Sequence, residues 1–131
     1  MSHRITLIQV RRPTSTDLNQ ELQWIGNSLG LFGLRDKDSS CFRIFITLVR
    51  RSRRTDPLSS DDIATSCDLS RATVIHHLTK LVDSGIVIHE KDGYLLRENN
   101  MERVVKNLHR DIGTIFEELE EVAKQIDQKL G

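Results

Sequence analysis

The chain has few of the residues that mark special classes of protein. It contains two cysteines, two prolines, one tryptophan and one tyrosine, and its 19 Lys and Arg balance 19 Asp and Glu. Its longest apolar runs are only a few residues, too short for a membrane span. Met1 to Val10 lacks the basic, apolar and small-residue zones of a secretory signal, so we expect no membrane partner and a cytoplasmic location.

The two cysteines, Cys41 and Cys67, stand in no metal-binding or disulfide pattern. Without a Cys-x-x-Cys or Cys/His spacing, the sequence encodes neither a zinc module nor a disulfide framework. We expect both cysteines to be buried apolar residues, with a redox sensor as the alternative. No metal and no cofactor are expected.

The sequence also lacks the motifs of common enzymes: a glycine-rich phosphate loop, a nucleophile elbow and a His-Glu-x-x-His pattern. His76 and His77 are adjacent, so on a helix they point about 100° apart and cannot easily share one metal ion. A site that adds Cys67 or His89 is the alternative. We expect no enzymatic activity.

The zero net charge conceals an uneven distribution. Residues 1–57 hold ten Lys and Arg against five Asp and Glu, residues 58–97 four against six, and residues 98–131 five against eight. A local basic surface is enough to attract phosphate. The arginines that form such a cluster are Arg11, Arg12, Arg50, Arg51, Arg53 and Arg54.

The first 57 residues predict one strand and two helices. A strand is expected from Arg4 to Arg12, which is rich in β-branched and aliphatic residues and ends at Pro13. A helix with apolar residues at Leu18, Leu22, Ile25 and Leu29 follows a cap at Thr16 or Asp17, and Gly30 and Gly33 then form a loop. The second helix, Ser39 to Arg51, has Phe42, Phe45, Ile46 and Val49 on one face. The arginines at its end are either a solvated helix end or contacts to a DNA backbone.

Residues 58–84 predict two short helices joined by a tight turn. The first is capped by Ser59 or Ser60 and directs Ile63, Ala64 and Cys67 inward. Asp68 is expected in the left-handed conformation that glycine usually adopts there, and Leu69 fills the turn. Ser70 caps the second helix, which buries Val74, Leu78, Leu81 and Val82 and ends at Gly85.

The opposite face of that second helix carries residues that suit the major groove of DNA, or else a solvated surface. Arginine and lysine reach guanine or phosphate, threonine donates or accepts, and alanine touches a thymine methyl group. The candidate DNA-binding residues on this helix are Ser70, Arg71, Ala72, Thr73, His76, His77 and Lys80.

Residues 86–97 predict a short hairpin. Asp92-Gly93 lies between two apolar runs, the typical signal of a type I′ turn with positive φ at both central residues. Lys91 at the tip, with His89 and Arg97 on the strands, is expected along a phosphate backbone or in a minor groove.

A long helix is predicted from Asn99 or Asn100 to the end of the chain. It carries an a/d heptad seam of Val105, Leu108, Ile112, Ile115, Leu119, Val122 and Ile126. About 30 helical residues span roughly 45 Å, which favours a homodimer over a helix folded back on its own domain. Glu117, Glu118, Glu120 and Glu121 would then point away from DNA.

Residues 58–97 resemble the winged helix-turn-helix of ArsR- and MarR-type transcriptional regulators, and Glu21–Gly30 and Ser40–Phe45 are similar to a group of archaeal regulators of this type. The shared signature is Ile63-Ala64, Leu69-Ser70-Arg71, Val74, His76-His77-Leu78, and Leu81 leading to Gly85-Ile86-Val87. The resemblance implies that the helix after Ser70 reads DNA, that Lys91 lies on the wing and that the protein is a dimer. Metal-sensing members carry a Cys-x-Cys pair, for which Cys67 alone cannot substitute, and Asp68 replaces the usual glycine.

Together these patterns predict a mainly α fold with a small β component: a winged helix-turn-helix domain at 1–97, with its motif core at 58–97, and a coiled-coil-like dimerisation helix at 98–131. The expected function is sequence-specific binding of double-stranded DNA as a transcriptional regulator. The alternative is a winged-helix module that binds another protein and has weak affinity for DNA. The sequence leaves open a small ligand pocket at the dimer interface, or no ligand at all.

Overall fold

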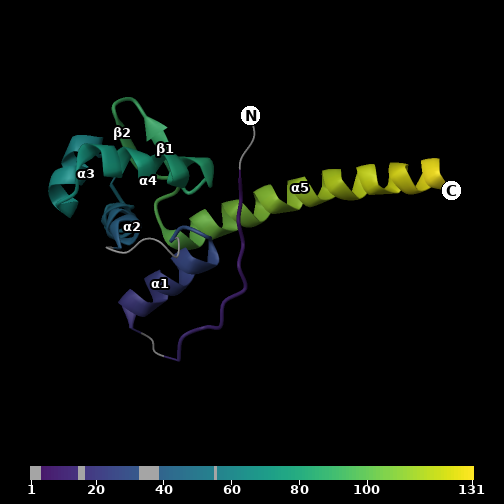
Figure 1. Ribbon diagram of the computed structural model, residues 1–131, viewed down its shortest axis with the longest axis horizontal. Helices are drawn as coiled ribbons and strands as arrows, with labels where there is room; N and C mark the ends of the chain where they lie inside the picture. Colours follow the sequence, from purple (N-terminus) through teal and green to yellow (C-terminus); the bar gives the residue numbers. More distant parts are fainter. Residues whose placement is uncertain (1–3, 15–16, 33–38, 55) are drawn as a thin grey trace.

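The computed structural model describes residues 4–14, 17–32, 39–54 and 56–131. Its helices are α1 (Leu18–Ser28), α2 (Ser40–Arg50), α3 (Ser60–Cys67), α4 (Arg71–Asp83) and α5 (Met101–Leu130), and its strands are β1 (Val87–Glu90) and β2 (Gly93–Leu96). The first four helices and the hairpin form a globular body from which α5 projects (Figure 1). None of the helices in these ranges is long and apolar enough to cross a membrane. The fold is therefore mainly helical with one antiparallel hairpin, as a winged helix-turn-helix requires.

Four of the helices begin where a polar side chain accepts a hydrogen bond from the backbone of the first turn. Asp17 accepts from the amide of Gln20, and Ser59 accepts from Asp62. Ser70 and Asn100 accept in the same way from Thr73 and Arg103. Such caps satisfy amide groups that have no partner inside the helix, which is why these starts could be predicted from the sequence. Thr16 and Gly33 lie outside the described residues.

Helix α2 is the centre of the core. It packs against α1, α3, α4 and β2, and Ile44 and Phe45 are completely buried in it. The predicted face was too narrow: Ile46 and Val49 are only partly buried, whereas Leu48 is fully buried. A helix surrounded on several sides buries more than one stripe. The prediction that both cysteines are buried is confirmed.

The N-terminal segment is not a strand, which corrects the expectation for Arg4 to Arg12. Residues 4–13 are all described and form no strand in that range. Instead, the amide of Arg4 donates to the carbonyl of Asp83, and that of Ile8 donates to Ser28, so the segment runs past the ends of α4 and α1. Apolar β-branched residues favour extended backbone, but no sheet edge lies beside this segment for it to join.

The hairpin also differs from its prediction. Glu90 pairs with Gly93, so the two loop residues are Lys91 and Asp92, and of these only Lys91 has a positive φ, at 54°. A type I′ turn at Asp92-Gly93 is therefore wrong. Gly93 is buried because Leu58 forms a bridge with Tyr94, which brings the preceding backbone alongside it.

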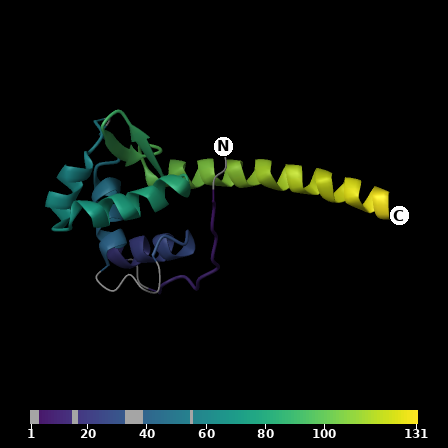
Figure 2. The same cartoon turned by 45° about the horizontal axis from the view of Figure 1, so that its top comes forward.

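Helix α5 leaves the body after its first turns, as two views of the chain show (Figures 1 and 2). Val104 and Leu108 are buried in the core, but every residue from Gly113 onward is exposed. The alternative of a helix folded back on its own domain is therefore wrong.

Candidate nucleic-acid interface

The turn between α3 and α4 has the geometry that the sequence predicted. Asp68 lies in the left-handed region, with φ 54° and ψ 51°, and Leu69 is partly buried against the core. The amide of Leu69 donates to the carbonyl of Ala64 over 2.9 Å, which closes the end of α3. Because Ser70 then caps α4, the angle between the two helices is fixed by local hydrogen bonds.

Side chains of α2 hold the end of α3 in place. Nη1 of Arg43 donates to the carbonyl oxygen of Cys67 over 2.8 Å, and Oγ1 of Thr47 lies 3.4 Å from Sγ of Cys67. On the other side of the motif, Val74, Leu78 and Leu81 of α4 are completely buried. The rigid support leaves one face of α4 free to meet a partner.

The exposed face of α4 carries the predicted DNA-binding residues. Ser70, Arg71, Ala72, His76 and Lys80 are exposed, and Thr73 and His77 are half-buried. The sequence reading had not included Ile75 and Thr79, which the structure also exposes on α4. Their helical spacing places them beside Arg71, Ala72 and His76, so the periodicity could have identified them.

Two of these side chains already have partners within the protein. Nε of Arg71 lies 3.5 Å from a carboxylate oxygen of Asp61 in α3, but both side chains are about 70% exposed and the pair is weak. Nζ of Lys80 donates to the carbonyl oxygen of Leu31 over 3.2 Å, so this ammonium group points toward the loop after α1. Arg71 can be released to a nucleic acid more easily than Lys80.

The wing presents one free cation. Lys91 is exposed at the tip of the hairpin, and His89 stacks on Tyr94 with their rings 4.2 Å apart. Arg97 instead donates from Nη1 and Nη2 to the carboxylate of Asp111 in α5, over 2.6 and 3.3 Å. The hydrogen bond to Asp111 raises the pKa of Arg97. Arg97 therefore joins the wing to α5, and the expectation that it would lie along a phosphate backbone has no support in this geometry.

The arginines after α2 divide into two groups. Arg50, Arg53 and Arg54 are exposed, whereas Nη2 of Arg51 forms an ion pair with Asp56 at 2.8 Å. Arg53 and Arg54 line a groove of about 410 Å³ with Glu90 of the wing and Arg103 of α5. Arg103 was missed by the sequence reading, because only the fold brings the start of α5 next to the end of α2.

The described residues contain no group of three or more His, Cys, Asp and Glu side chains arranged to hold a metal ion. Cys67 is buried against Thr47, and His89 is engaged with Tyr94.

Comparison with known proteins gives one match. Residues 38–90 match the family model of a helix-turn-helix domain, a range that runs from just before α2 to the end of β1. No curated protein and no solved structure matches the chain. The match supports a DNA-binding regulator of the helix-turn-helix type.

Proposed function

We propose that this helix-turn-helix protein is a homodimeric transcriptional regulator that binds double-stranded DNA sequence-specifically. The observation that carries the proposal is the exposed face of α4, which presents polar and small side chains on a helix that is otherwise buried in the core. In the proposed assembly, residues 1–97 bind DNA and residues 98–131 hold the dimer together. The proposal keeps the cytoplasmic location that the sequence led us to expect.

Helix α4 is proposed to lie in the major groove. Arg71 is placed to donate to guanine, Thr73 to donate or accept at a base edge, and Ala72 to contact a thymine methyl group. His76 lies one turn further along the same face, and His77 at its border. Arg71 has to leave Asp61, an exposed ion pair whose loss costs little.

Phosphate contacts are proposed for the cations around this helix. Lys91 at the wing tip and Arg50, Arg53 and Arg54 after α2 are all exposed. Ser70 adds the amino end of α4, where backbone N–H groups favour an anion. Arg51 and Lys80 are weaker candidates, because both are already bound within the chain.

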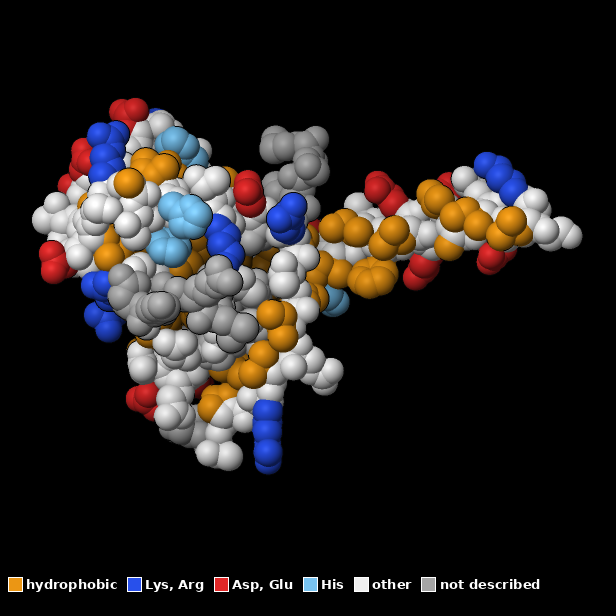
Figure 3. Space-filling view, viewed as in Figure 1, with side chains coloured by type: hydrophobic (Ala, Val, Ile, Leu, Met, Phe, Trp, Pro, Cys, Tyr) orange, Lys and Arg blue, Asp and Glu red, His pale blue; other side chains and the backbone are white. Residues whose placement is uncertain are grey.

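The dimer is proposed to form along α5. Its seam is exposed beyond Ile112: Leu119, Val122 and Ile126 are 58%, 52% and 49% exposed. Figure 3 shows groups of hydrophobic side chains along the projecting part of α5, with acidic side chains on both edges. Exposed apolar patches of this kind mark interaction sites in soluble proteins, which supports a partner that covers this face of α5.

A second copy of this chain is the partner that fits the seam. The a/d residues recur every three and four positions, the spacing that packs against an identical helix in a coiled coil. A two-fold axis across this seam would also relate the two α4 helices, which is the arrangement that reads two half-sites about 34 Å apart.

The alternative function is a winged-helix module that binds an acidic protein through the same surface. The groove beside Arg53 and Arg54 favours it, because Arg103 adds a further cation there. The two functions differ in salt dependence. For duplex DNA, the logarithm of the binding constant falls linearly with the logarithm of salt concentration, with a slope set by the number of phosphates contacted.

The test is selection of bound fragments from random duplex DNA, followed by titration of the selected sequence. The double variant Arg71→Ala with Thr73→Ala should lose about tenfold or more in affinity for that sequence, since each good base contact contributes about 1–3 kcal/mol. The matched control, Thr65→Ala with Ser66→Ala, changes two exposed residues of α3 and should bind normally. Equal affinity of the double variant and the wild type would refute the placement of α4 in the groove.

A further inference from the structure

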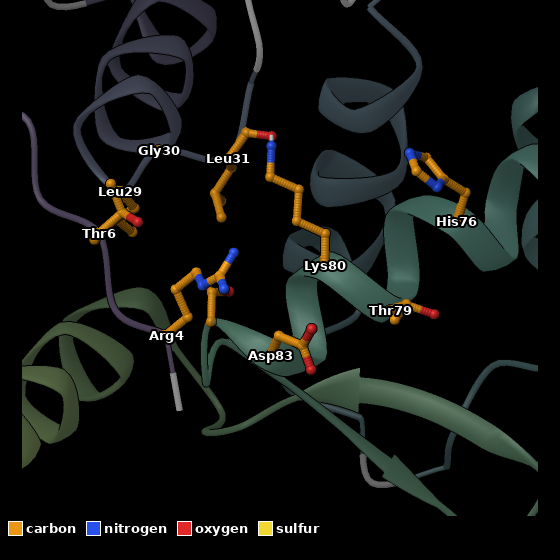
Figure 4. A pocket seen from close by; sticks show the side chains of 10 residues that line it. Arg4, Thr6, Leu29, Gly30, Leu31, His76, Thr79, Lys80 and Asp83 are labelled. Atoms are coloured by element: carbon orange, nitrogen blue, oxygen red, sulfur yellow. Dashed lines mark hydrogen bonds between the residues drawn. The ribbon is translucent and has the colours of Figure 1, made fainter. Parts of the chain in front are cut away.

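A cavity of about 420 Å³ opens between the N-terminal segment, the end of α1 and helix α4 (Figure 4). Leu29, Gly30 and Leu31 form one wall, and Thr79 and Lys80 of α4 form another. The volume is within the range of pockets that hold small molecules.

The walls of the cavity fit one another closely. The amide of Arg4 donates to Asp83 over 3.2 Å, and that of Ile8 donates to Ser28 over 2.8 Å, so both helix ends hold the segment. Gly30 has a φ of +69°, and a Cβ atom there would lie 2.7 Å from Cγ2 of Thr6. The cavity is therefore bounded by specific contacts.

The charges in the cavity favour an anion. Figure 4 shows Arg4 and Lys80 entering from opposite walls, the first from the N-terminal segment and the second from α4. Among the described residues Arg4 forms no ion pair, and Lys80 is bound only to a neutral carbonyl oxygen. Asp83 is the one acidic residue among the described residues of the lining, so these residues together carry one positive charge in excess. One excess positive charge suits a monoanion better than a phosphate dianion.

We propose that this cavity binds a small monocarboxylate with an apolar body, and that the bound ligand weakens binding to DNA. The carboxylate would lie between Arg4 and Lys80, and the apolar part against Leu29 and Leu31. The second half of this proposal rests on the proposed function, because it requires that α4 bind DNA.

Ligand binding in the cavity and DNA binding by α4 would be coupled through the residues that the two sites share. Lys80 and His76 line the cavity, and both are also on the candidate DNA-binding helix. A carboxylate paired with Lys80 keeps the ammonium group of Lys80 away from DNA phosphates. It also adds a negative charge next to the exposed face of α4 that is proposed to bind DNA. By linkage, DNA must weaken ligand binding by the same factor.

Hexanoate is the probe for the site, titrated calorimetrically into the whole chain without DNA. The expected Kd is about 1 mM, which corresponds to about −4 kcal/mol. Hexan-1-ol, which has the apolar body without the charge, should bind at least tenfold more weakly. Equal affinity for the alcohol, or no heat from hexanoate at ten times the expected Kd, would overturn the site.

Two variants, one that removes a positive charge from the cavity and one that removes a negative charge, distinguish a ligand-binding role of these residues from a structural role. Arg4→Gln should raise the Kd for hexanoate about threefold to fivefold, the effect of removing one partly exposed cation. Asp83→Asn should lower it by about twofold, since the backbone hydrogen bond between residues 4 and 83 remains in both variants. Lys124→Gln, on the exposed part of α5, is the control and should change nothing. A change in the same direction for both variants would contradict the proposal.

The regulatory half is measured with the selected duplex. Hexanoate at 10 mM should weaken duplex binding several-fold. In Arg4→Gln the hexanoate concentration needed for half of this effect should rise threefold to fivefold, while the affinity for duplex without hexanoate stays normal. Hexanoate binding with unchanged DNA affinity would overturn the coupling and leave the site. A chain that binds hexanoate but no duplex would contradict the proposed function alone.

Discussion

Arg97, the residue directly after β2, donates two hydrogen bonds, of 2.6 and 3.3 Å, to the carboxylate of Asp111 in α5. The two side chains are 27% and 35% exposed, so the pair is better shielded from water than the pairs Arg51–Asp56, Arg71–Asp61 and Lys106–Glu102. It joins the wing to the helix that is proposed to form the dimer. The direction in which α5 leaves the body therefore depends on this contact as well as on Val104 and Leu108.

Removing the carboxylate should loosen α5. Asp111→Asn is expected to lower the free energy of unfolding by about 1 kcal/mol, because a two-pronged pair of moderate exposure is worth more than a surface pair. Urea denaturation of Asp111→Asn, Arg97→Gln and the double variant measures it. If the losses of the two single variants simply add in the double variant, the pair contributes no coupling and the prediction is wrong. Because the hydrogen bond to Asp111 raises the pKa of Arg97, the guanidinium stays charged at neutral pH, and its contribution is lost on the alkaline side only in strongly alkaline solution.

Gly93 should not tolerate a side chain. A Cβ atom there would lie 2.5 Å from Cβ of Pro57 and 2.9 Å from the carbonyl oxygen of Leu58. Gly93→Ala should therefore cost about 1–3 kcal/mol of stability, since the rigid Pro57 and the Leu58 backbone must move.

Gly113 is the matched control, because nothing lies within 4 Å of a Cβ atom there and the residue is inside α5. Gly113→Ala should stabilise the chain by up to about 1 kcal/mol through helix propensity. Thermal unfolding of the two variants should show shifts of opposite sign.

Glycine at position 68 should make the protein more stable than aspartate does. Its backbone is left-handed, so Asp68→Gly is expected to raise the free energy of unfolding by about 0.5 kcal/mol, and Asp68→Val to lower it by about 1 kcal/mol or more. Ser66→Gly, two residues earlier in α3, should instead lower it by about 0.5 kcal/mol. A loss of stability in Asp68→Gly would mean that the aspartate side chain supports the turn in a way that the backbone angle does not explain.

The proposed dimer predicts a specific response to charge on α5. Leu119→Glu with Val122→Glu should yield monomers, because the seam would then carry two carboxylates from each copy. Thr114→Glu with Gln128→Glu adds the same charge at two exposed heptad c positions away from the seam and should leave the mass in solution unchanged. The mass in solution of the wild type and of both double variants is measured by analytical ultracentrifugation. A monomeric wild type would exclude the proposed dimer.

Both cysteines should be unreactive in the folded protein. Cys41 and Cys67 are 1% and 6% exposed, so a thiol reagent should modify them only as fast as the chain opens. Labelling should accelerate by orders of magnitude in urea. Rapid labelling of Cys67 without denaturant would support the redox role that the sequence left open.

The sequence by itself determined the elements that depend on near neighbours. Asp17, Ser59, Ser70 and Asn100 cap helices within three residues of themselves, and the left-handed Asp68 follows from the short turn between α3 and α4. Periodicity also separated the buried face of α4 from its exposed face. These features could be predicted because their hydrogen bonds and side-chain spacing are local.

Only the tertiary structure decided the features that depend on distant partners. The segment after Arg4 is extended but unpaired because helix ends, and not a strand, lie beside it. The hairpin turn lies one residue earlier than the sequence predicted. Its position goes with the contact that Pro57 and Leu58 make beside Gly93. In the same way, Arg97 donates a hydrogen bond to Asp111, and Lys80 donates one to the carbonyl of Leu31. The local spacing of residues does not predict either hydrogen bond. A charged or β-prone residue shows what it is able to bind, and the fold decides which partner comes within reach.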